Sequence, residues 1–422
     1  MSATEALQAP ARVTDRFHPS TRGWAARLGV LVAIFGGVLW ITAVVPGFWA
    51  DRIALAAVYA IIGLSLNVIL GYTGQVSLGH HAFIGIAAFT AANYVTKAGN
   101  CTTTEGCSLG AFGIATLLAI LSGAVASGVL GIVALRIKGL YLALLTLAYG
   151  FVAETSIFEI PAFTGGGAGV PAPRPDGFTS DRAFAYLCFL FVALVLFVDW
   201  RLLRSKVGRA IISVKNSEAV AASYGINVTS YKLLAFVVSG IFAGLAGSLF
   251  AFRNTNVVVN DFTFATALLW VLMVVVGGLG NRVGVVIGGA FFALFPFLVE
   301  LWSGLEHYVR DELARDPSHF SLVFGALLAT LTIVQFQGGI AEQISPITRW
   351  LRGERFSMHP DGGGKHHHEP PLKTLKTRLG LDRPSVQTTE EAGGSSDGSP
   401  AVRAPDVWGN LVGSSSKRER DV

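Results

Sequence analysis

The chain has 422 residues, of which 52% are hydrophobic and only 14% are charged. Soluble globular proteins carry about 25% charged residues because their surface faces water. The composition therefore excludes an ordinary cytosolic enzyme and a disordered protein, and three cysteines are too few for a disulfide scaffold. The net charge of +5 does not call for a nucleic-acid partner, because membrane proteins concentrate Lys and Arg in their cytoplasmic loops.

Ten segments are apolar over lengths close to the roughly 20 residues that a membrane-spanning helix needs. In chain order they are residues 28–45, 53–70, 78–96, 109–135, 140–160, 183–198, 231–252, 264–276, 283–302 and 320–336. The eighth segment is short and runs into the Gly-rich sequence 277–280, which is typical of a broken or re-entrant element. The expected fold is all-α, a polytopic membrane protein with about ten transmembrane helices.

Lys and Arg residues are distributed unevenly over the connections between these segments. The connections around residues 1–27, 136–138, 201–232, 282 and 349–355 hold more than twice as many as the alternate set. By the positive-inside rule, the richer set should be cytoplasmic. Both termini are then expected in the cytoplasm, which requires an even number of spans.

The composition divides the chain into a cytoplasmic N-terminal head at 1–27, a transmembrane domain at 28–337 and a tail at 338–422. The tail is polar and rich in Gly, Ser and Pro, so it cannot bury enough apolar area to offset its ordering entropy. We therefore expect a disordered cytoplasmic tail. Its run of three adjacent histidines, 366–368, is interpreted as a solvated tract, although such a run can bind a transition metal weakly.

No group of residues at membrane depth is typical of catalysis. Glu154 and Glu159 are the closest approach to a carboxylate pair, but a five-residue spacing places them about 140° apart around a helix. The tail also lacks a phosphate-binding Gly-rich loop. The sequence therefore predicts no catalytic residue, no metal site and no cofactor bound by this chain.

Glycines and polar residues interrupt the hydrophobic pattern between residues 63 and 83. The candidate pathway residues in this stretch are Asn67, Gly71, Gly74, Gln75, Ser77 and His80. Non-helical backbone at membrane depth persists only where protein or a water-filled cavity surrounds it, and lipid penalises polar side chains. These residues either line a translocation pathway at a broken helix, whose free N–H groups can hold a carboxylate, or form a tight cytoplasmic turn.

The largest connection of the basic set contains residues 206–227. Gly208 and Gly225 bracket about 16 residues with apolar side chains at helical spacing, which predicts one short amphipathic helix. Arg209, Lys215 and Glu218 lie on this helix. The helix either docks a peripheral cytoplasmic subunit or rests on lipid headgroups.

The three cysteines lie in two different settings. Cys101 and Cys107 share a short loop on the predicted outer side, where disulfides persist, so we hypothesise a bridge between them; two free thiols are the alternative. Cys188 lies inside the sixth predicted span and should be a free, packed thiol.

Residues 67–83, with Gly-Tyr-Thr-Gly-Gln-Val-Ser-Leu-Gly-His at their centre, resemble the signature of branched-chain amino-acid ABC-importer permeases of the LivM type. Further blocks match in the same order, at residues 136–147, 164–166, 208–236 and 277–284. The resemblance covers residues 54–336 and leaves out the tail. The block at 208–236 departs by one residue from the spacing of the generic importer motif.

The resemblance implies an importer in the bacterial plasma (inner) membrane, with a second, LivH-like permease subunit, two cytoplasmic ATP-binding subunits and an extracytoplasmic substrate-binding protein. ATP would be used by those partner subunits alone. The ATPase coupling residues implied are Gly208, Arg209, Lys215, Glu218 and Gly225. The substrates implied are branched-chain or related amino acids; urea, short amides or aromatic acids remain the alternative.

A self-sufficient secondary transporter or channel is a rival interpretation from a different class. It would need an ionisable coupling group inside the membrane, for which only Glu154, His80 and His81 are available. A membrane scaffold or receptor is a second rival, and the polar broken helix argues against it.

Overall fold

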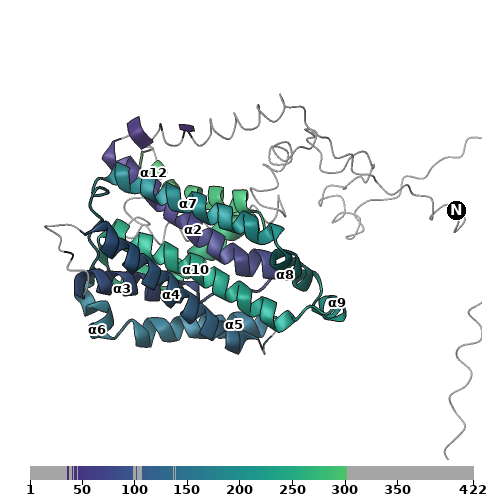
Figure 1. Cartoon of the computed structure of the whole chain (residues 1–422). Coiled ribbons are helices and arrows are strands. Elements are labelled where there is room, and N and C mark those ends of the chain that lie inside the picture. Colours follow the sequence, from purple (N-terminus) through teal and green to yellow (C-terminus); the bar gives the residue numbers. More distant parts are fainter. Residues whose placement is uncertain are drawn as a thin grey trace, which may run out of the picture. The chain divides into compact units, whose positions relative to one another are not determined.

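The computed structural model describes residues 46–97, 107–135 and 139–301, together with residues 36, 37, 40, 42–44, 101 and 137. Most of this part of the chain is helical (Figure 1). The N-terminal head, most of the predicted first span, the predicted tenth span and the C-terminal tail with its histidine run lie outside the described residues.

The described elements follow one another with short connections. The helices of the first half are α2 (Gly47–Leu66), the π-helical η2 (Asn67–Thr73), α3 (His80–Lys97), α4 (Leu109–Ala134), α5 (Leu140–Val152), the π-helical η3 (Ala153–Ile157), α6 (Pro161–Thr164) and the 3-10 helix η4 (Gly166–Ala168). The second half holds α7 (Asp181–Arg204), α8 (Lys206–Asn216), α9 (Glu218–Ser223), α10 (Val228–Asn254), the 3-10 helix η5 (Val259–Phe262), α11 (Phe264–Gly277) and α12 (Arg282–Leu301). Two short strands, β1 (Val170–Pro171) and β2 (Asn256–Val257), pair antiparallel.

Within the described residues, four helices are long and apolar enough to cross a membrane: α2 with η2, α4, α7 and α10. A fifth span results if residues 141–157 and 161–168, which meet at an angle of 89°, are counted together. The predicted eighth span is confirmed as short, because α11 has 14 residues, about 21 Å of helix, against a hydrocarbon core of about 30 Å.

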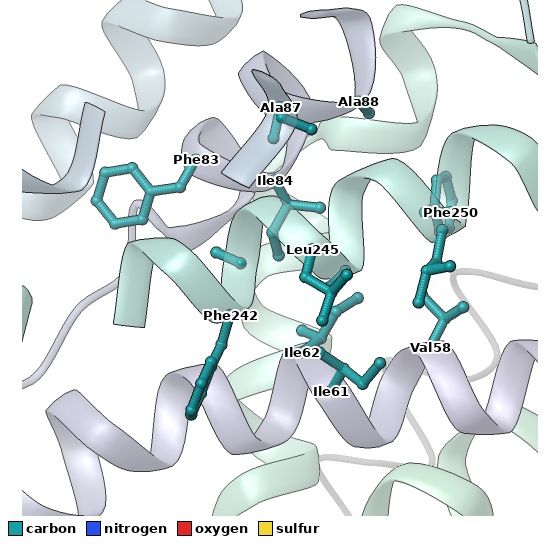
Figure 2. Close-up of a cluster of buried hydrophobic side chains, with 14 of the residues drawn as sticks. Val58, Ile61, Ile62, Phe83, Ile84, Ala87, Ala88, Phe242, Leu245 and Phe250 are labelled. Carbon is teal, nitrogen blue, oxygen red and sulfur yellow. The ribbon is translucent and has the colours of Figure 1, made fainter. Parts of the chain in front are cut away.

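Helices α2 and α10 lie at the centre of the bundle (Figure 1). Helix α10 packs against α4, α3 and α2, and α2 also packs against α12 and α7. Figure 2 shows the core where Ile61 and Ile62 of α2 meet Ile84 of α3 and Leu245 of α10, all of them buried. Because lipid is as apolar as these side chains, their contribution to helix packing is close van der Waals contact.

Small residues allow α10 to approach α4 closely. A Cβ atom added to Gly123 of α4 would lie 2.6 Å from the carbonyl oxygen of Gly240 in α10, and one added to Gly244 would lie 2.4 Å from the oxygen of Ala119. In lipid, where apolar burial does not drive association, such close backbone contact is a main source of helix–helix attraction.

Polar caps mark where the helices begin. Ser108, Ser180, Ser205, Ser217 and Thr263 each accept a hydrogen bond from a backbone N–H group in the first turn of the following helix. Each such cap stabilises its helix by about 1 kcal/mol relative to alanine. The cap at Ser217 corrects one prediction: residues 208–225 form two helices, α8 and α9, because the extended Ser217 (φ −163°) ends one and begins the other.

Candidate translocation pathway and coupling surface

The predicted break in the second span is present. Helix α2 continues through one π-helical segment, η2, and ends at Gly74, whose φ of 70° is left-handed. The chain then runs without helix until α3 begins at His80. The second span is longer than predicted, because it begins at Gly47 and reaches Thr73. Single π-helical turns inside α-helices occur frequently at functional sites.

Asn67 and Gly71 face the Gly-rich turn that precedes α12. The Asn67 Oδ1 atom accepts a hydrogen bond of 2.8 Å from the backbone N–H of Gly280. A Cβ atom added to Gly71 would lie 2.1 Å from that same Oδ1 and 2.7 Å from the Gly280 nitrogen. The two Gly-rich breaks, 71–74 and 277–280, therefore lie against each other, and a side chain at position 71 would separate them.

His80 is completely buried at the meeting point of α2, α3 and α10. Ser65 Oγ donates to the Ser239 carbonyl oxygen (2.7 Å), Ser239 Oγ donates to the Ser65 carbonyl oxygen (2.8 Å), and His80 Nε2 lies 2.7 Å from Ser65 Oγ. Because the Ser65 proton is already engaged, the His80 Nε2 atom is the donor in the third bond. The histidine therefore ties three helices together.

The loop between η2 and α3 is packed against α5. The Leu78 N–H donates to Thr146 Oγ1 (3.0 Å), and a Cβ atom added to Gly79 would lie 2.2 Å from the Thr146 carbonyl oxygen. Ser77 is 1% exposed and Gln75 is 9% exposed, so both side chains are buried in protein rather than in water.

Several buried polar atoms of this region have no hydrogen-bond partner among the described residues. They are Asn67 Nδ2, Gln75 Oε1, Ser77 Oγ, His80 Nδ1 and His81 Nδ1. An unsatisfied buried group costs about 1–3 kcal/mol, so its retention calls for an explanation. The side chains of Asn67, Gln75 and Ser77 carry no charge, and together they offer both donors and acceptors.

The predicted coupling residues occupy different positions on α8 and α9. Gly208 is buried at the start of α8, where a Cβ atom would lie 2.2 Å from the Leu202 carbonyl oxygen. Arg209 is exposed, and its guanidinium donates to the Arg204 carbonyl oxygen. Gly225 follows α9 with a φ of 75°. Lys215 is directed toward η2, where its Nζ donates to the Gly71 carbonyl oxygen (2.7 Å).

Glu218 forms an ion pair within the chain. Its Oε1 atom lies 2.5 Å from Nζ of Lys232 in α10, whose side chain is 7% exposed. The pair fixes α9 against α10. The outward face of α8 and α9 is partly apolar instead, with Ile212, Val220 and Tyr224 exposed to 39%, 52% and 81%. These exposed apolar side chains are available to contact a partner subunit or lipid headgroups.

Comparison with known proteins identifies the family. The family model described as branched-chain amino acid transport system, permease component, matches residues 49–332. The chain belongs to this permease family. The high-affinity branched-chain amino acid permease proteins LivM of Salmonella typhimurium and Escherichia coli are each 32% identical over 330 residues, 71% of this chain and 70% of theirs. A probable LivM protein of Methanocaldococcus jannaschii is 23% identical over 68% of this chain and 91% of its own. No solved structure matches the chain.

The family match covers both the broken helix and helices α8 and α9, and the chain is thus a membrane permease component. The structure also shows residues that the sequence analysis did not single out. Tyr72 donates to Asp199 Oδ2 (3.1 Å), and Arg282 Nε lies 3.3 Å from the same oxygen. Asp199 is fully buried near the end of the apolar helix α7. A carboxylate directly after the predicted span 183–198 is a signal that could have revealed this contact.

Proposed function

We propose that this chain is one of two transmembrane subunits of an ATP-driven importer that moves branched-chain or related amino acids inward across the bacterial plasma membrane. The observation that carries the proposal is the family match over residues 49–332, together with 32% identity to LivM permease proteins. The other subunits are a LivH-like permease, two cytoplasmic ATPases that hydrolyse ATP, and an extracytoplasmic binding protein.

The full topology of this subunit has about ten spans with both termini in the cytoplasm. In that orientation, α8 and α9 face the cytoplasm and the loop with Cys101 and Cys107 faces outward. The structure pairs these two cysteines in a disulfide, a bond that persists in oxidising compartments. The excess of Lys and Arg in α8 and its neighbours agrees with the same orientation.

The translocation pathway runs past the broken helix at Asn67, Gly71, Gly74, Gln75, Ser77 and His80. A zwitterionic amino acid carries a carboxylate and an ammonium group, and both can be bound by neutral donors and acceptors. Each such hydrogen bond contributes about 0.5–1.5 kcal/mol net, which is weak enough to allow release. The buried, unsatisfied side-chain atoms of Asn67, Gln75 and Ser77 are groups of this kind.

The decisive experiment reconstitutes the complete complex in vesicles and measures uptake of labelled leucine with and without ATP. Uptake that requires ATP and the binding protein, and that excess isoleucine or valine inhibits, supports the proposal. If only urea, acetamide or phenylalanine inhibits uptake, the protein belongs to the same class of importer but carries a different class of substrate. Uptake driven by an ion gradient in the absence of ATP would overturn the importer class.

The coupling surface is tested by a pair of exposed tyrosines. Tyr224, after α9, is 81% exposed, and Tyr141, in α5, is 75% exposed. We expect Tyr224→Ala to weaken co-purification of the ATPase subunits, because it removes the largest exposed apolar group beside α9. Tyr141→Ala is the matched control and should leave co-purification unchanged. Equal behaviour of the two variants would exclude the surface at Tyr224 as the contact.

A further inference from the structure

Lys215 connects the cytoplasmic helix α8 directly to the broken helix. Its Nζ atom donates to the Gly71 carbonyl oxygen at 2.7 Å. The stem of the same side chain lies against Gly74, because a Cβ atom added there would be 3.4 Å from Lys215 Cγ. The lysine therefore extends along the turn at 71–74 rather than away from the bundle.

The chemistry at this end of η2 favours such a contact. The last carbonyl groups of a helix have no partner within the helix, and the helix dipole makes that end negative. An ammonium group supplies both a donor and a positive charge. Glycine at position 74 leaves room for the approach, since a side chain there would meet the stem of Lys215.

The same segment is connected to two further elements. Asn67 accepts from Gly280 in the turn between α11 and α12, and Tyr72 donates to Asp199 of α7. A displacement of α8 that moves Lys215 thus acts on η2, and η2 acts through Asn67 on the turn before α12. These contacts join helices far apart in sequence, with separations of 144 residues for Lys215–Gly71 and 213 for Gly280–Asn67.

We propose that Lys215 is a positioning residue that transmits movement of α8 to the broken helix η2, rather than a residue that contacts the ATPase subunits. The proposal rests on the proposed function, in which ATPases act on α8 and α9. The charged hydrogen bond of Lys215 accompanies the packing of α8 against η2. Its loss should separate ATP hydrolysis from transport while the subunits stay together. ATP hydrolysis can drive transport only through contacts whose free energy differs between the two conformations of the transporter.

The test uses the reconstituted complete complex with Lys215→Met, which keeps the length of the side chain and removes the donor, and Lys215→Arg, which restores a donor. Lys206→Met, at the exposed start of α8, is the matched control. With Lys215→Met we expect normal co-purification of the ATPases, normal ATP hydrolysis, and uptake per ATP lowered about fivefold or more, the lower end of typical coupling. Lys215→Arg should recover part of the loss, and Lys206→Met should behave as wild type.

Hydrogen exchange of the backbone amides at residues 67–77 provides a second measurement on the same complexes. It should be faster in Lys215→Met than in wild type or Lys206→Met. Loss of ATPase subunits from Lys215→Met, or unchanged uptake per ATP, or unchanged exchange, would each overturn the role of Lys215. Absence of ATP-driven uptake by the wild-type complex would instead overturn the proposed function itself, so the two failures are distinguishable.

Discussion

The two ends of helix α2 are held in different ways. At its first turn, Asp51 lies 2.5 Å from Arg253 Nη2 of α10 and 3.4 Å from Arg174 Nη2, and Arg174 also pairs with Asp181 at the start of α7. At its other end, Gly71 and Asn67 each take part in one hydrogen bond to a neighbouring element. Figure 1 shows the two ends of the bundle, with α6 near the first and α8 and α9 at the second.

The first end, which is the proposed outer end, is cross-linked by several independent bonds. The disulfide between Cys101 and Cys107 lies beside a backbone hydrogen bond from Asp176 to Cys107, and strand β1 pairs with β2 in the register Val170–Val257. The ion pairs join α2, α7, α10 and the loop that carries Arg174, and the disulfide closes a neighbouring loop. Such an end should resist rearrangement during a transport cycle.

The second end, which is the proposed cytoplasmic end, also has ion pairs, Glu218 with Lys232 and Arg282 with Asp199. The segment η2 itself is joined to its neighbours by hydrogen bonds at Gly71, Asn67 and Tyr72. The hydrogen bonds of Lys215 to Gly71 and of Gly280 to Asn67 can break or re-form without unfolding a helix, because each has one partner in the backbone of η2 or of a turn. We predict that conformational change is concentrated at these hydrogen bonds, where α8 meets η2. The predictions below test this difference, beginning with the largest effect.

Replacing Gly71 by Ala should abolish uptake. The new Cβ atom would lie 2.1 Å from Asn67 Oδ1 and 2.7 Å from the Gly280 nitrogen, so the two breaks must separate. Overpacking of this kind costs about 3 kcal/mol. Gly113→Ala in α4 is the control, since nothing lies within 4 Å of its Cβ position. Wild-type uptake by Gly71→Ala at matched expression would contradict the arrangement described for η2.

Replacing Asp51 by Asn should lower stability at the proposed outer end by about 2 kcal/mol, because two arginines lose a shared, partly exposed carboxylate. The thermal unfolding of the complex in detergent measures this loss. Uptake per ATP should stay at the wild-type level. Asp176→Asn, at an exposed loop position, is the control and should change neither quantity. A strong loss of coupling in Asp51→Asn would show that both ends of α2 move.

Replacing Cys107 by Ser should destabilise the same end by about 2 kcal/mol. This is the free energy expected from the entropy that the unfolded chain regains when the short loop is no longer closed by the disulfide. Wild-type protein treated with reductant should unfold at the temperature of the variant, whereas reductant should not shift the variant. Mass spectrometry of unreduced protein provides the direct check. Alkylation of both thiols without reduction would exclude the bond.

Replacing Glu218 by Arg should reduce uptake with a stability loss of about 1 kcal/mol, because it places two cations together at a partly exposed site. The double variant Glu218→Lys with Lys232→Glu restores an ion pair with its signs exchanged. If Glu218 acts only by holding α9 on α10, the double variant should recover uptake per ATP. Continued loss in the double variant would assign Glu218 a contact with the ATPases.

Local signals in the sequence predicted a large share of the fold. The span predicted at 109–135 is helix Leu109–Ala134, the short eighth span is α11, and the break after residue 70 is present as η2 and Gly74. The free Cys188 is buried in α7 as expected. Each of these features depends on a hydrophobic stretch, a cap or a glycine that acts on its near neighbours, so the order of residues is sufficient to determine it.

The partners across the bundle were decided by tertiary structure alone. Nothing in the sequence pairs Ser65 with Ser239, Glu218 with Lys232, or Lys215 with Gly71. In a membrane protein a helix face that meets lipid and one that meets another helix are both apolar, so hydrophobic patterning does not reveal which faces touch. The sequence thus determined most of the helices and the break after η2 but not the one at Ser217, while helix packing decided which polar groups meet.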